Sequence, residues 1–166
     1  MNYAKIIKED LANGLGVRVS LFVSGCTHKC KGCFNKEAWD FNYGKIFDKE
    51  TEDKIIKFLS DDKIKGLSLL GGDPLMKKNR TTINKLIKRI KKELPTKDIY
   101  VWTGYTFEEL EEIEDKELKE ILTNIDFLIE GRFVEELKDR KCYLRGSTNQ
   151  RIFEKVDGIF VEKREV

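Results

Sequence analysis

Short apolar runs alternate with longer charged runs along this chain of 166 residues, and no other feature limits the possible folds as strongly. The apolar runs are rich in β-branched residues, as strands are, and the charged runs repeat apolar residues at helical spacing. This alternation is typical of the α/β class. The predicted strands are residues 17–23, 66–70, 98–102, 126–133 and 158–162, and the predicted helices are residues 48–60, 78–93 and 106–122.

Three unusual loops follow the first three predicted strands. They read SGCTHKCKGC at residues 24–33, GGDP at 71–74 and TGY at 103–105. Strands joined by one helix pair in parallel through right-handed crossovers, and ligands bind beyond the carboxyl ends of such strands. We therefore expect the three loops to meet at one edge of the sheet. The longest stretch predicted to be irregular is 138–151.

The composition favours one domain, residues 1–166, with no general attraction to polyanions. Lys and Arg total 32 against 30 for Asp and Glu, so the net charge of +2 predicts neither nucleic-acid binding nor membrane binding. We expect a cytoplasmic protein, because the sequence shows no secretory leader and no apolar run of about 18 residues. Thiols stay reduced in the cytoplasm, so clustered cysteines indicate metal ligands or catalytic groups rather than disulfides.

Three of the four cysteines, Cys26, Cys30 and Cys33, lie in the loop after the first predicted strand. Thiolates at this spacing can surround a compact inorganic core, and Gly32 lets the backbone approach that core closely. We expect these cysteines to bind a 4Fe-4S cluster. Three protein ligands leave one iron open, and an open iron is a place for a substrate or cofactor to bind.

Two other interpretations of the cysteines remain open. A structural zinc site usually takes two separated ligand pairs, and here only Cys30 and Cys33 form such a pair. The single histidine, His28, or the distant Cys142 would have to complete the tetrahedral set. The other interpretation is that the thiols are partly buried and bind nothing.

The loops after the second and third strands predict further ligand contacts. Two glycines directly after a strand expose backbone N–H and C=O groups, although such a turn by itself is a common connector. Since the cysteine loop ends at the same sheet edge, we expect Gly71 and Gly72 to contact a cofactor. We expect Thr103 and Gly104 to line the same pocket.

The pattern Cys-x3-Cys-x2-Cys after the first strand resembles the signature of radical S-adenosylmethionine (SAM) enzymes. The resemblance implies that the amino and carboxylate groups of SAM chelate the open iron. An electron from the reduced cluster then cleaves SAM to methionine and a 5′-deoxyadenosyl radical, which abstracts hydrogen. In these enzymes a Gly-Gly-Glu-Pro strand end usually holds the methionyl amino group. Asp73 takes the place of that Glu here, so the resemblance implies that Asp73 binds the cofactor together with Gly71 and Gly72.

A closer resemblance runs through most of the chain, to the activating proteins of anaerobic (class III) ribonucleotide reductases. It implies that Phe34 covers the adenine of SAM. Leu15 departs from this family's usual proline, and Gly32 departs from the aromatic residue of many radical SAM enzymes. The similar segments, in order, are MNYAKI at 1–6, NGLGVR at 13–18, LFVSGCTHKCKGCFN at 21–35, GGDPL at 71–75, VWTGY at 101–105, IEGRF at 129–133 and RGSTNQR at 145–151.

This resemblance implies an enzyme that docks on the large anaerobic reductase subunit and removes hydrogen from one glycine Cα, leaving a glycyl radical. Cys26, Cys30 and Cys33 form the implied catalytic centre, and a flavodoxin-like or other low-potential protein donates the electron. A complete barrel of eight strand–helix units needs about 250 residues, so we expect a partial, open (β/α) barrel with mostly parallel strands. The alternatives are activation of another glycyl-radical enzyme, peptide modification, or a small iron–sulfur or zinc module for electron transfer or protein contact.

Three further features each allow two interpretations. The segment at residues 145–151 is suited to binding carboxylates or a protein strand, or it is an ordinary exposed loop. His28 either forms a hydrogen bond beside the cluster or is solvated. The basic residues within 77–92 form a solvated helix face or a docking patch for an acidic electron donor.

Overall fold

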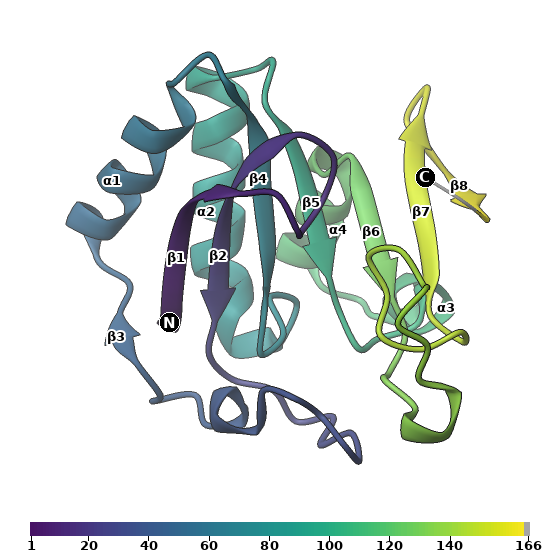
Figure 1. Ribbon diagram of the computed structural model, residues 1–166. Coiled ribbons are helices and arrows are strands. Elements are labelled where there is room, and N and C mark those ends of the chain that lie inside the picture. Colours follow the sequence, from purple (N-terminus) through teal and green to yellow (C-terminus); the bar gives the residue numbers. More distant parts are fainter. Residues whose placement is uncertain (165–166) are drawn as a thin grey trace.

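One mixed sheet of eight strands runs through the protein, and the computed structural model describes residues 1–164 (Figure 1). The order of strands across the sheet is β3-β1-β2-β4-β5-β6-β7-β8. The strands are β1 (Asn2–Asp10), β2 (Val17–Val23), β3 (Lys45–Ile46), β4 (Ile64–Gly71), β5 (Asp98–Trp102), β6 (Phe127–Glu130), β7 (Arg151–Val156) and β8 (Ile159–Lys163).

The expected partial barrel with mostly parallel strands is wrong. Only β2, β4, β5 and β6 are parallel to one another, which makes three of the seven strand pairings parallel. On both sides of this centre the chain turns back on itself and pairs antiparallel, β1 with β2 and β3, and β7 with β6 and β8. These reversals end the βα winding that a barrel requires, because a barrel needs every strand to be followed by a crossover.

The three strands that sequence reasoning missed, β1, β3 and β7, all lie in these antiparallel flanks. Strand β1 escaped detection because charged and apolar residues mix along it, and most of its residues are half-buried. Strand β7 joins β8 through Asp157 and Gly158, which both have positive φ angles. Asp-Gly is a strong hairpin signal, so this pairing was detectable from the sequence.

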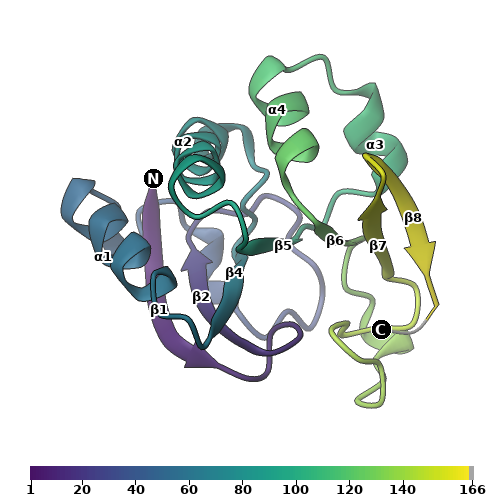
Figure 2. The same ribbon diagram turned by 90° about the horizontal axis from the view of Figure 1, so that it is seen from above.

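Helices α1 (Lys49–Leu59), α2 (Lys77–Glu93) and α4 (Lys116–Asn124) cover one face of the sheet, and Leu110 of the short helix between β5 and α4 joins the same core (Figure 2). The expected helices at 48–60 and 78–93 are confirmed. The third expected helix is interrupted, because Asp115 accepts a hydrogen bond from the Leu118 amide and starts α4 after the short helix α3 (Phe107–Glu112). Within residues 1–164 no helix combines the length and the apolar character that a bilayer-spanning segment needs.

Side chains on the central strands alternate between the helix-covered face and the opposite face. Leu67, Leu69 and Val101 belong to the main core beneath the helices. On the opposite face Tyr100 and Trp102 belong to a smaller apolar cluster. The face that lacks the main core therefore carries aromatic and polar side chains together with a few aliphatic ones, such as Ile129 and Ile152.

Arg18 is the largest charged side chain that is completely buried, and it lies on this opposite face. Its Nε donates to Ser68 Oγ at 2.7 Å, its Nη1 lies 2.7 Å from the carboxylate of Asp98, and its guanidinium lies 4.0 Å from the ring centroid of Tyr100. The three partners come from β4 and β5, so Arg18 ties β2 to its two parallel neighbours.

We predict that Arg18→Met lowers the free energy of unfolding by about 3 kcal/mol, because it leaves Asp98 as an uncompensated, largely buried carboxylate. Urea denaturation of the reduced, metal-free protein measures the change. The matched control is Lys163→Met, which removes a half-exposed ion pair of 2.8 Å with Glu154 and is expected to cost less than about 1 kcal/mol. Equal effects of the two substitutions would contradict the role assigned to Arg18.

Candidate functional site

The three unusual loops border one cavity of about 520 Å³. The cysteine loop, the glycine turn after β4 and the end of β5 supply one side, and residues 131–150 supply much of the other. The lining residues are Asn13, Cys26, His28, Cys30, Gly32, Cys33, Phe34, Trp39, Leu70, Gly71, Gly72, Trp102, Thr103, Gly104, Gly131, Phe133, Lys138, Leu144, Arg145, Gly146 and Gln150. The structure thus brings together nine of the ten site residues predicted from the sequence.

The three clustered cysteines are half-buried free thiols on the wall of this cavity. The loop is held at its start, where the Cys26 amide donates to the Trp39 carbonyl at 3.2 Å. A turn follows, in which the Cys33 amide donates to the Cys30 carbonyl at 3.2 Å. Three sulfur donors from one loop suit a soft metal centre such as an iron–sulfur cluster or zinc.

Burial favours the protonated form of two of these metal-free thiols, Cys26 and Cys30. It is the largest cause that raises the pKa of Cys26 to about 11, and it also raises the pKa of Cys30. Metal binding requires the thiolate, so loading of this site releases protons and becomes more favourable as the pH rises.

The glycine turn after β4 is packed against the start of the cysteine loop. The Gly72 amide donates to the Val23 carbonyl at 2.7 Å, and the Asp73 amide donates to the Gly25 carbonyl at 2.9 Å. A Cβ at Gly72 would lie 2.7 Å from the backbone oxygens of both Gly25 and Ala38. A side chain at this position would therefore displace the backbone next to Cys26.

Asp73, the tenth predicted site residue, lies behind the cavity wall and is completely buried. Its carboxylate accepts from the Leu75 amide at 2.8 Å, the Thr103 hydroxyl at 2.9 Å and the Gly104 amide at 2.9 Å. It also lies 2.9 Å from His28 Nε2. The side chain thus joins the ends of β4 and β5 to the cysteine loop.

The wall formed by residues 131–150 is the part of the site that sequence reasoning described least. The side chain of Gln150 accepts from the Gly146 amide at 2.8 Å and donates to the Gly131 carbonyl at 2.8 Å. Arg145 Nη1 donates to the Gln150 carbonyl at 3.0 Å. The RGSTNQR segment is therefore an organised loop that folds against the end of β6. Its dense polar composition was the available sequence signal.

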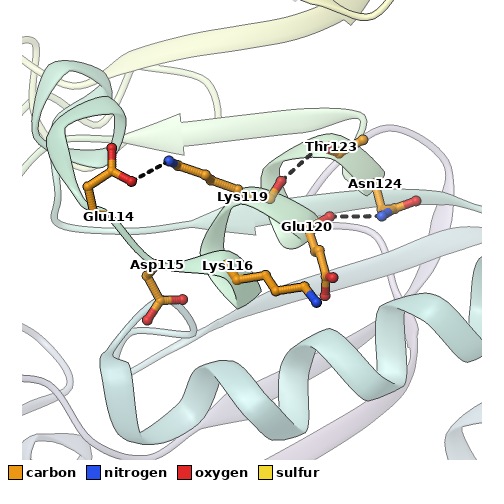
Figure 3. A pocket seen from close by; sticks show the side chains of 7 residues that line it. All are labelled: Glu114, Asp115, Lys116, Lys119, Glu120, Thr123 and Asn124. Atoms are coloured by element: carbon orange, nitrogen blue, oxygen red, sulfur yellow. Dashed lines mark hydrogen bonds and ion pairs between the residues drawn. The ribbon is translucent and has the colours of Figure 1, made fainter.

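A second cavity, of about 450 Å³, lies along α4 and differs in chemistry (Figure 3). Only polar and charged residues line it, and Figure 3 shows Lys119 paired with Glu114, 2.7 Å apart. Neither cysteines nor apolar side chains contribute to this cavity among the residues that the structure describes. The cavity beside the cysteine loop is therefore the candidate cofactor site.

We predict that Cys26 of the metal-free protein reacts with iodoacetamide far more slowly at pH 8 than an unhindered cysteine peptide does. A pKa of about 11 in place of 9.0 lowers the thiolate fraction about 100-fold. Mass spectrometry of the alkylated peptides under anaerobic conditions gives the rates. The rate for Cys26 should keep rising above about pH 10, where the rate for the peptide has levelled off. A plateau for Cys26 that coincides with that of the peptide would contradict the raised pKa.

Comparison with known proteins identifies the family. Residues 12–153 match the family model described as a 4Fe-4S single cluster domain. The chain is 48% identical over 152 residues to the anaerobic ribonucleoside-triphosphate reductase-activating protein of Haemophilus influenzae, covering 90% of this chain and 96% of that protein. The protein of the same name from Escherichia coli K12 is 47% identical, and the match covers 90% of this chain and 96% of that protein. The one from enterobacteria phage T4 is 41% identical, and the match covers 96% of this chain and 98% of that protein. The chain therefore belongs to the family of anaerobic ribonucleoside-triphosphate reductase-activating proteins and contains a 4Fe-4S single cluster domain.

Proposed function

We propose that this protein activates an anaerobic ribonucleotide reductase by radical SAM chemistry. The observation that carries the proposal is a cavity lined by three clustered free cysteines together with the glycine-rich ends of β4 and β5. Cys142, the fourth cysteine, is not among the described residues that line this cavity. Three cysteine ligands beside a glycine turn are typical of a cluster that leaves one iron open to a small cofactor. An electron-transfer cluster is normally closed by four cysteines.

We propose Cys26, Cys30 and Cys33 as the ligands of a 4Fe-4S cluster. Held by these three cysteines, such a cluster would supply the electron for reductive cleavage of SAM and thereby allow hydrogen abstraction from a glycine of the reductase. The protein's own groups bind and orient SAM, through the exposed backbone of the two strand-end glycines and through side chains at the rim. The proposed SAM contacts are Gly32, Cys33, Phe34, Gly71, Gly72, Thr103 and Gly104.

Apolar side chains of the cavity suit a reaction that must exclude water. Leu70, Trp102, Phe133 and Leu144 line the cavity beside the cysteines. Trp102 is fixed by a hydrogen bond of 2.8 Å from its Nε1 to the Leu144 carbonyl. A rigid apolar wall of this kind protects a reactive radical from side reactions.

The proposed partners are the large subunit of an anaerobic ribonucleotide reductase and a flavodoxin-like or other low-potential electron donor. The names of the relatives support the first partner. We propose that residues 1–166 form one activase domain and that the protein works in the cytoplasm, where thiol ligands stay reduced. Activation of another glycyl-radical enzyme by the same chemistry is the related alternative.

A small zinc module is the alternative from a different class, and one observation favours it. Ligand atoms of Cys26, His28 and Asp73 lie within 4.8 Å of one another. A tetrahedral zinc site needs four such ligands. The metal content of the purified protein separates this alternative from the activase.

We predict that anaerobic reconstitution gives about four iron atoms and four sulfides per chain, as expected for a 4Fe-4S cluster. Strong reductant and SAM should then yield methionine and 5′-deoxyadenosine, measured by chromatography, and a glycyl-radical signal when the reductase is present. Ser substitution of Cys26, Cys30 or Cys33 should abolish the product, whereas Cys142→Ser should leave it unchanged. An intact cluster that never cleaves SAM would refute the proposed function.

We predict that Phe34→Ala weakens SAM affinity about 5- to 150-fold without changing iron content, because stacking of a base on an aromatic ring contributes about 1–3 kcal/mol. Phe34 is 92% exposed, so its removal leaves the packing of the protein intact. Ile159→Ala is the matched control, because Ile159 is 69% exposed and lies on strand β8. Isothermal titration of the reconstituted variants with SAM gives the affinities. Equal SAM affinities of the two variants would show that Phe34 does not contact SAM.

A further inference from the structure

His28 is enclosed by the ends of two strands although it belongs to the cysteine loop. Its side chain is 6% exposed. The ring stands edge-on to Tyr105, with the ring centroids 4.7 Å apart. On another side a Cβ built on Gly104 would lie 2.4 Å from His28 Cδ2, so the absence of a side chain at Gly104 makes room for the imidazole. The middle of the cysteine loop is therefore anchored to the end of β5.

The polar partner of His28 is the buried carboxylate of Asp73, 2.9 Å from Nε2. An ionised carboxylate has about four acceptor positions, and here four donors surround it. They are the Leu75 amide, the Thr103 hydroxyl, the Gly104 amide and His28 Nε2. A fully buried carboxylate requires such compensation, and its acceptor capacity is filled without a cofactor.

We infer that His28 and Asp73 act as a clamp that fixes the cysteine loop on the ends of β4 and β5 and thereby slows the loss of the bound cluster. Asp73 is in this assignment a positioning residue and not a contact of SAM. The inference depends on the cluster of the proposed function but not on SAM cleavage.

The clamp lies at the position from which it can control the cysteines. His28 stands between Cys26 and Cys30 in the chain, two residues from each. If the imidazole loses its acceptor, the loop is still held at its start by the Cys26 amide but loses its central anchor. Outer residues that orient metal ligands typically change metal affinity 10–100-fold when substituted.

The test compares three variants in reconstituted protein. His28→Phe keeps a ring against Tyr105 and Gly104 but removes the donor, whereas His28→Gln places an amide donor near the position of Nε2. Asp73→Asn keeps the shape of the side chain but removes the charge. The cluster is reconstituted without SAM, and the transfer of iron to a chelator is then followed by absorbance. Lys31→Ala is the control, because the exposed Lys31 side chain pairs only with Glu135 and Glu136 among the described residues.

We expect His28→Phe to release iron about tenfold faster than the wild type, and His28→Gln and Lys31→Ala to release it at nearly the wild-type rate. Asp73→Asn should release iron at least as fast as His28→Phe, because it also disturbs the contacts with Leu75, Thr103 and Gly104. The double variant should be no faster than Asp73→Asn, because both substitutions act on the same His28–Asp73 contact. If Asp73→Asn does not fold, the two His28 variants decide the outcome alone.

Unchanged iron release in His28→Phe, or an equal acceleration in His28→Gln, would overturn the clamp. The clamp would also be overturned if Asp73→Asn lost SAM affinity and His28→Phe did not, because this result would make Asp73 a contact of SAM. A wild-type protein that takes up zinc and no iron refutes the proposed function instead, and zinc release from the same variants then tests the clamp.

Discussion

Parallel pairing of β2, β4 and β5 is the constraint on which the rest of the site depends. In this register Val23 lies opposite Gly71, and Leu69 lies opposite Val101, so the three strands end at nearly the same level. The segments that leave these ends carry the cysteines, the glycine turn and Thr103. Residues 45 or more positions apart in the sequence, such as His28 and Asp73, thereby come within hydrogen-bond distance.

The close approach of these strand ends has an electrostatic cost that the chain resolves locally. A completely buried carboxylate is unfavourable unless donors surround it, and Asp73 finds them directly after β5 and on the cysteine loop. The same interactions order the backbone next to the cysteines. Stability and cofactor binding therefore rest on the same few contacts in this part of the molecule, whereas Arg18 secures the other end of the strands.

The antiparallel flanks explain how a short chain completes its sheet without a barrel. Each flank uses a hairpin or a returning strand in place of a crossover helix, and β3 and β8 are left as the sheet edges. Residues 131–150 lie between the last central strand and the returning β7, and this long connection forms a wall of the cavity. The site thus extends beyond the three loops that follow the first strands.

The sequence by itself determined the local features: the central strands, two of the covering helices, the three thiols and the glycine turn. These features follow from residue types at short spacing, which periodicity and turn chemistry express directly. Only the tertiary structure decided that β7 returns antiparallel to β6, that Gln150 closes the cavity wall and that Asp73 points inward. Each of these depends on contacts between residues far apart in the chain, and local patterns do not specify which distant donor a buried acceptor will meet.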